Sequence, residues 1–171
     1  MKHHIRFYAA LAAFALLGSS AEAAAAVNTH LGQPASSSVT LEVVGPGPFC
    51  SGEGFLDLAF QRNLPDGSSV FPFVIPPTKV LVVTDMDWQW NSGTAGTRQT
   101  LRLLLVNNTT PFVSNRVFES TVELDSSGGG GASVAATAGF VVSPAATICI
   151  SPDPGGGVLN HLILRGYLVP K

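Results

Sequence analysis

The sequence predicts an all-β protein: an antiparallel β-sandwich or jelly roll of roughly 8–10 short strands after a cleaved N-terminal signal peptide. Three observations support this prediction. Short runs of β-branched and aromatic residues alternate with clusters of Gly, Pro, Asn and Ser. The clusters recur every roughly 8–15 residues, as in two-sheet proteins. After residue 23, the sequence has no convincing helical period.

The first 23 residues have the order of a secretory signal peptide. Lys2 and Arg6 precede an apolar run over residues 7–18, and Ala21 and Ala23 give the small-residue spacing of a cleavage site. A second site follows Ala26. The apolar run is too short to span a membrane, and a buried helix would instead show polar residues at helical spacing. We therefore expect export to the periplasm or the exterior of a bacterial cell.

Composition narrows the range of functions. Charged residues make up only 12% of the chain, and the formal net charge is −2. Such a chain has no basic surface to follow a phosphate backbone, so we expect no nucleic-acid partner. No later apolar run reaches the length of a membrane helix, so we expect no membrane span. The 46% of hydrophobic residues is enough for a folded core.

The predicted strands follow a flexible lead-in, residues 24–38, and belong to a single domain, residues 39–171. In order, they cover residues 39–44, 54–60, 69–75, 79–90, 97–106, 116–124, 133–138, 140–142, 147–150 and 161–169. The run 69–75 contains Pro72 and stops at a Pro-Pro pair. Because proline cannot donate a backbone hydrogen bond, this run is predicted at the edge of a sheet.

Residues 79–90 give the strongest strand signal, and we expect them to form a central strand because their first half is apolar on both faces. Strict alternation places Val80, Val82, Thr84, Met86, Trp88 and Trp90 on one face, and Leu81, Val83, Asp85, Asp87 and Gln89 on the other. We therefore expect Val80 and Val82 in the core, together with Leu164.

The later strands also alternate. The residues expected inside are Leu101, Leu103, Leu105, Phe118, Val122, Leu124, Leu162, Leu164 and Leu168. In the last strand, Ile163, Tyr167 and Val169 then point outward. A strand that is apolar on both sides suggests an outer face covered by further copies of the chain, so we expect a homo-oligomer.

The two cysteines, Cys50 and Cys149, form an even pair in a chain predicted to be exported. An oxidising compartment favours a disulfide between them. The alternative is two buried thiols that never meet.

Trp88 and Trp90 are the strongest candidates for ligand binding. If exposed, two indoles on one strand face could stack on the rings of a glycan, with Asp87 and Gln89 as polar neighbours. If buried, they fill one end of the core beside Met86, and this alternative is the favoured one.

Metal binding and catalysis have weaker support. Asp85 and Asp87 are weak candidates for a calcium site if Asp125 or Asp153 joins them, although charges at the solvent side of a strand end explain them better. The sequence also lacks clustered Cys and His ligands for zinc. Only His30 and His161 follow the signal peptide, and the sequence has no Gly-x-Ser-x-Gly turn. We therefore expect that the protein is not an enzyme and that it binds neither a cofactor nor a metal ion.

Three segments carry a family resemblance within residues 75–170. They are Pro-Pro-Thr-Lys-Val-Leu-Val-Val-Thr-Asp (76–85), Phe-Val-Val-Ser-Pro-Ala-Ala-Thr-Ile-Cys (140–149) and Arg-Gly-Tyr-Leu-Val (165–169). The chain resembles a group of small exported bacterial proteins of uncharacterised function. That group in turn resembles jelly-roll sandwiches of the tumour-necrosis-factor-like and C1q-like kind. Thr78 and Ala146 stand where the group has turn glycines. The resemblance implies a fold, and it brings no catalytic residues.

The leading expectation is thus a secreted, non-enzymatic β-sandwich that acts by binding or by self-assembly, with a trimer as the candidate assembly. Two alternatives are a carbohydrate-binding module that uses Trp88 and Trp90, and a structural subunit of a surface appendage that pairs through the final strand containing Tyr167. A hydrolase with an unrecognised site is a third.

Overall fold

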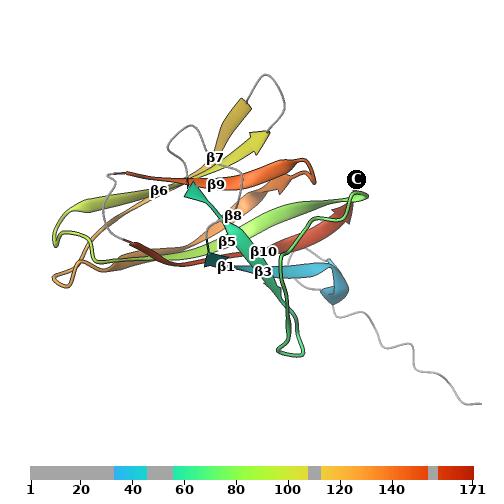
Figure 1. Ribbon diagram of the computed structural model, residues 1–171, viewed down its shortest axis with the longest axis horizontal. Coiled ribbons are helices and arrows are strands. Elements are labelled where there is room, and N and C mark those ends of the chain that lie inside the picture. The colour runs from blue at the N-terminus through green and yellow to red at the C-terminus, as the bar shows by residue number, and fades with distance from the viewer. Residues whose placement is uncertain (1–32, 46–55, 108–112, 154–157) are drawn as a thin grey trace, which may run out of the picture.

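A computed structural model describes residues 33–45, 56–107, 113–153 and 158–171 (Figure 1). These residues form the 3-10 helix η2 (Ala35–Ser37) and the strands β1 (Ser38–Gly45), β2 (Leu56–Asp57), β3 (Ala59–Asn63), β4 (Ser69–Val70), β5 (Lys79–Asn91), β6 (Arg98–Asn107), β7 (Val113–Glu123), β8 (Gly130–Val142), β9 (Ala146–Asp153) and β10 (Val158–Pro170). The predicted signal peptide, its cleavage sites and most of the lead-in lie outside the described residues. Within the described ranges, no helix is long and apolar enough to cross a membrane.

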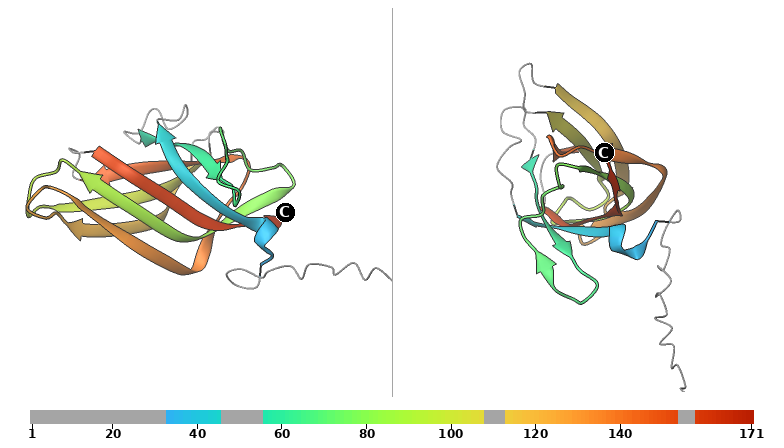
Figure 2. Two further views of the ribbon diagram at one scale, coloured as in Figure 1. Left: turned by 90° about the horizontal axis from the view of Figure 1, so that it is seen from below. Right: turned by 90° about the vertical axis from the view of Figure 1, so that its right-hand side faces the viewer.

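The strands form two antiparallel sheets that lie face to face, which confirms the predicted β-sandwich (Figures 1 and 2). The large sheet has the order β4-β3-β1-β10-β5-β8, and the small sheet has the order β2-β9-β6-β7. We call the face of each sheet that is turned away from the other sheet its outer face.

The core lies between the two sheets. Its largest fully buried side chains include Trp88, Trp90 and Met86 from β5, which meet Leu101 and Leu103 from β6. Burying a side chain of this kind contributes about 1.5–3 kcal/mol, so this layer is the main stabilising feature of the fold. Leu103 and Leu164 are buried as predicted, whereas Leu105 and Phe118 are only half-buried against the core.

The predicted register of β5 is wrong in its first half. Leu81 and Val83 are buried in the core, and Val80 and Val82 lie half-buried on the outer face. The reason is a β-bulge at Thr84, because Val83 and Asp85 pair with the consecutive residues Gly166 and Arg165 of β10. A bulge adds one residue to one strand, so the alternation changes phase there. After it, Met86, Trp88 and Trp90 face the core as predicted.

Other element boundaries also differ from the predictions. The run 54–60 is not one strand, because Leu56–Asp57 pairs with the small sheet and Ala59–Asn63 with the large one. The predicted strands 133–138 and 140–142 are parts of β8. The run 69–75 contributes only β4, Ser69–Val70, which does lie at a sheet edge as predicted.

Strand β10 occupies the middle of the large sheet, between β1 and β5. Leu162, Leu164 and Leu168 are buried, and Tyr167 and Val169 are half-buried on the outer face, as predicted. Both backbone edges of β10 are paired with neighbouring strands. In this arrangement β10 has no free edge for pairing with another chain, and the hypothesis of a surface-appendage subunit stays a prediction.

Polar contacts join the strands on both outer faces. On the small sheet, Arg102 Nε lies 2.8 Å from Glu119 Oε2, and Arg102 Nη1 lies 2.9 Å from Asp153 Oδ2. On the large sheet, the amides of Asn63 and Gln61 donate hydrogen bonds of 3.0 and 3.2 Å to Glu42. These amide bonds lower the pKa of Glu42 because they favour the ionised carboxylate.

Cys149 belongs to a second, smaller buried cluster with Leu104 and Val106. Its neighbours in sequence, Ile148 and Ile150, face the main core, so Cys149 faces the outer side of the small sheet. It is nevertheless fully buried. Cys50 lies outside the described residues, so the disulfide stays a prediction.

Candidate functional site

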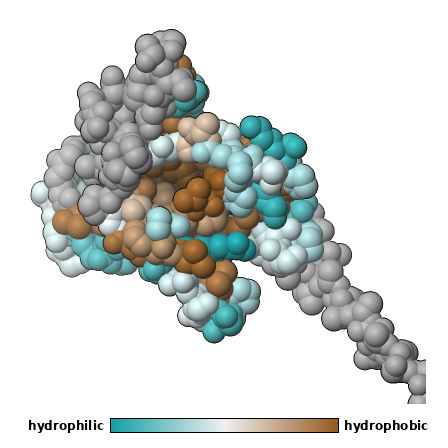
Figure 3. Space-filling view, turned by 45° about the vertical axis from the view of Figure 1, so that its right-hand side comes forward, coloured by the Kyte–Doolittle hydropathy of each residue, from teal (hydrophilic) through white to brown (hydrophobic). Residues whose placement is uncertain are grey.

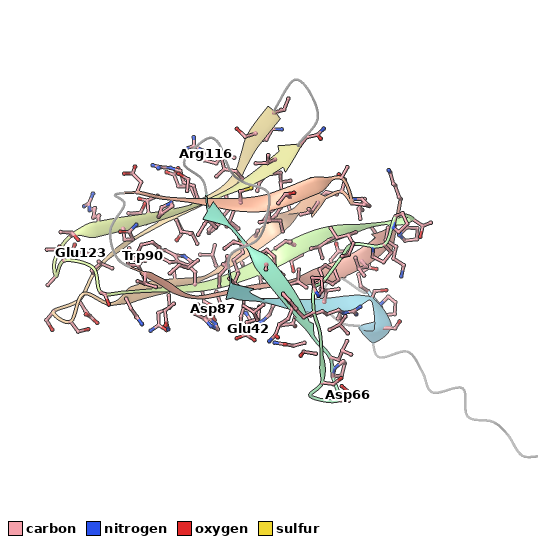
Figure 4. The ribbon with its side chains drawn as sticks, viewed as in Figure 1. Glu42, Asp66, Asp87, Trp90, Arg116 and Glu123 are labelled. Carbon is pink, nitrogen blue, oxygen red and sulfur yellow. The ribbon has the colours of Figure 1, made fainter. Side chains whose placement is uncertain are left out.

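Trp88 and Trp90 are each 1% exposed, so the favoured expectation of burial is confirmed. Figure 4 shows Trp90 between the two sheets. A sugar ring stacks on an indole only where the face of the ring is open to solvent. Neither tryptophan can therefore form the stacking surface considered from the sequence, although Trp88 does border the groove described next.

A polar groove of about 590 Å³ lies on the outer face of the large sheet. Its floor is the second half of β5, where Asp87, Gln89 and Asn91 alternate with the buried tryptophans. Figure 4 shows Asp87 pointing away from the small sheet. His161 of β10 pairs with Gln89 on one side, and Ser133 of β8 pairs with Asp87 on the other. The groove thus gathers side chains from three neighbouring strands.

The β7–β8 connection also lines the groove, through Asp125 and Ser127. Asp125 Oδ1 accepts hydrogen bonds from Ser127 Oγ at 2.6 Å, Ser127 N at 2.8 Å and Gly129 N at 3.0 Å. The side-chain bond from Ser127 is the largest cause of the lowered pKa of Asp125. This carboxylate is therefore ionised at neutral pH, and its hydrogen bonds fix the loop.

Glycines allow this connection and β8 to approach their neighbours closely. Gly128 has a φ of +77°, and a Cβ there would collide with the carbonyl of Gly93. The amide of Gly93 donates a 2.9 Å hydrogen bond to the carbonyl of Gly128, which ties the two loops together. At Gly131, a Cβ would collide with the carbonyl of Trp88 on β5. The glycine run therefore leaves this side of the groove without side chains above the sheet.

The charges near the groove are only loosely paired. Arg165 Nη2 lies 3.9 Å from Asp87 Oδ2, and both side chains are more than a third exposed. An exposed pair at this separation contributes little to stability. Asp87 is consequently accessible to a ligand.

The predicted metal candidates do not come together as a full ligand set. Asp85 and Asp87 follow the bulge on the outer face, and Asp85 accepts a 2.7 Å hydrogen bond from Thr84. Asp125 borders the groove with Asp87, but Asp153 lies on the other sheet beside Arg102. Over the described ranges, no group of three His, Cys, Asp or Glu residues could hold a metal ion.

His161 and Ser133 line the same groove but lie on strands separated by β5. Neighbouring strands are about 4.8 Å apart, so the two backbones are about 10 Å apart. A nucleophile and its base need a hydrogen bond of about 3 Å. The sheet therefore holds this His-Ser pair too far apart for the activation that a serine hydrolase requires.

Sequence reasoning singled out Asp87 and Gln89 but did not group them with Ser127, Ser133 and His161. The available signal was the run of four glycines at residues 128–131. A glycine run beside a polar strand end can mark a place where backbones approach closely and side chains leave an open surface.

Fold and groove together define this chain as an antiparallel β-sandwich with a polar surface groove. No known family model matches it, and no curated protein resembles it at a significant level.

Proposed function

We propose that the protein is an exported, non-enzymatic binding module and that its polar groove binds a neutral saccharide. The observation that carries this proposal is the convergence of amide, hydroxyl, carboxylate and imidazole groups in one groove of about 590 Å³. Together these groups offer both donors and acceptors of hydrogen bonds, which suits the adjacent hydroxyl groups of a sugar. The carboxylates of Asp87 and Asp125 disfavour an anionic ligand.

Export is supported by the signal-peptide pattern of the first 23 residues, and the separation of His161 from Ser133 argues against that one serine-hydrolase pair. The size of the groove also lies within the range of small-ligand sites.

A titration of the purified protein with neutral monosaccharides and disaccharides tests the proposal. We expect saturable binding of at least one sugar, with NMR shift changes at the side-chain amides of Gln89 and Asn91. Replacing either residue with alanine is expected to weaken binding about five- to tenfold, because each removes hydrogen bonds of about 1 kcal/mol.

The matched control is Asn115→Ala, which removes an exposed amide from β7, outside the groove. It should bind the sugar like the parent. The proposal is wrong if no sugar shifts the groove residues, or if the control loses as much affinity as Gln89→Ala.

Self-association is a second candidate function, and a separate observation favours it. At the opposite end of the same outer face, the residues turned to solvent are apolar: Val80, Val82, Val141, Tyr167 and Val169. Val141 alone is 55% exposed. A continuous apolar patch on a sheet face is typical of a contact between subunits, including the trimers of jelly-roll proteins.

We expect sedimentation at micromolar concentration to detect an oligomer that the double substitution Val141→Ser and Tyr167→Ser converts to monomer. Val113→Ser is the control, because Val113 is 44% exposed on β7 in the other sheet. A parent protein that sediments only as a monomer would exclude this second function.

A further inference from the structure

An apolar cavity of about 400 Å³ opens at the other end of the sandwich from the polar groove. Figure 3 shows it as a hollow surrounded by hydrophobic residues. Leu81 lines the cavity and Gln89 lines the groove, and both belong to β5. Eight residues of strand separate them, which corresponds to about 26 Å. The cavity is therefore a different site from the groove.

The walls of the cavity come from both sheets. Leu41 of β1, Leu81 of β5 and Val142 of β8 line it from the large sheet, and Ile148 of β9 lines it from the small one. All four side chains are buried members of the main core. The cavity is thus an opening into the layer between the sheets, with walls held by paired strands.

The connection between β4 and β5 forms one rim. The amide of Phe73 donates a 2.8 Å hydrogen bond to the carbonyl of Phe60 in β3, which fixes this segment against the large sheet. Phe73 and Ile75 pack on the core, whereas Val74 between them is 71% exposed. An exposed valine beside an apolar cavity adds hydrophobic surface at the entrance.

The residues that line the cavity restrict the chemical class of ligand that it can bind. Among the described lining residues none is charged, and Thr147 is the one whose side chain can form a hydrogen bond. A polar or charged group would lose its hydration there without gaining partners, at a cost of several kcal/mol. The inserted part of a ligand must therefore be a hydrocarbon.

Shape restricts the hydrocarbon further. Packed sheets lie about 10 Å apart, and interdigitating side chains fill that layer. A ligand that enters the layer takes the place of such side chains, so its cross-section must match that of an aliphatic chain. We propose that this cavity binds a single acyl chain of an amphiphile, whose polar head stays in water at the entrance.

Displacement of a fluorescent fatty acid tests this proposal. The probe is cis-parinaric acid, and the competitor is dodecanoate below its micelle concentration. We expect saturable probe binding that dodecanoate reverses. Ala146→Leu, which adds three carbon atoms to the lining of the cavity, is expected to weaken probe binding about tenfold, because the added atoms exclude buried methylene groups of the ligand.

Two further variants complete the experiment. Val74→Ser alters the exposed rim without touching the core, so it should weaken binding even if Ala146→Leu fails to fold. Val141→Ser changes the apolar patch on the outer face and should leave probe binding unchanged. The acyl-chain proposal is overturned if dodecanoate does not compete, or if Val141→Ser reduces binding as much as Val74→Ser. Neither result would bear on sugar binding in the groove.

Discussion

Replacing Val83 with aspartate is expected to unfold the domain, whereas the same replacement at Val82 is expected to leave it folded. Val83 is 0% exposed and lies in the core of β5. An unpaired carboxylate at a buried position costs roughly 3–5 kcal/mol, which is a large part of the total stability of a domain of this size. Urea denaturation followed by circular dichroism measures the difference.

Val82 is the matched control, because it has the same side chain one residue earlier in the same strand. It lies half-buried on the outer face, between Tyr167 of β10 and Val141 of β8. A carboxylate there stays in contact with water, so we expect a loss of about 1 kcal/mol. Equal denaturation midpoints for the two variants, or a less stable Val82→Asp protein, would contradict the register that the bulge imposes.

We expect a disulfide between Cys50 and Cys149 in protein recovered from an oxidising compartment. The intact mass of this protein should correspond to a chain that begins at Ala24 or Val27 and is two hydrogen atoms lighter than the reduced form. The bond would close a loop of about 100 residues, and in the chain-entropy model it contributes up to about 4–5 kcal/mol. Reduction should therefore lower the midpoint of urea denaturation substantially.

Cysteine-to-alanine variants separate the bond from simple packing. If the disulfide is the source of stability, Cys50→Ala, Cys149→Ala and the double variant should lose similar amounts of free energy of unfolding. If packing dominates, Cys149→Ala alone should be costly, because its side chain is fully buried beside Leu104 and Val106. Two titratable thiols in the denatured, unreduced protein would exclude the bond.

Much of the fold could be predicted from the sequence. The alternation of apolar and polar residues and the residues that favour turns determine the nearby backbone without help from distant strands. Apart from β8, which was predicted as two strands, the strands from β5 to β10 lie within about three residues of the predicted bounds, and the inward leucines of β10 are correct. Which side chains in the first half of β5 face the core could not be predicted. A bulge depends on how β5 pairs with β10, and one extra residue in β5 leaves the alternation intact within each half of the strand.

The split of residues 54–60 between two sheets escaped prediction for a similar reason. Only Leu58 separates Leu56–Asp57 from Ala59–Asn63, and the two strands differ in their partners, since β2 pairs with β9 and β3 with β1. The groove was also only partly predictable. Asp87 and Gln89 stand out along β5, but Ser133 and His161 become their neighbours through pairings with distant strands.

The central position of β10 in the large sheet affects when the sheet can fold during translation. Of the described strands, β10 is the last to leave the ribosome, yet it joins β1 to β5. Until it arrives, the large sheet consists of two separate parts, β4-β3-β1 and β5-β8, whose edges toward β10 are open. A nascent chain of this design has no complete fold to adopt before its final strand is made. The large sheet can therefore be completed only after residues 158–170 have been made.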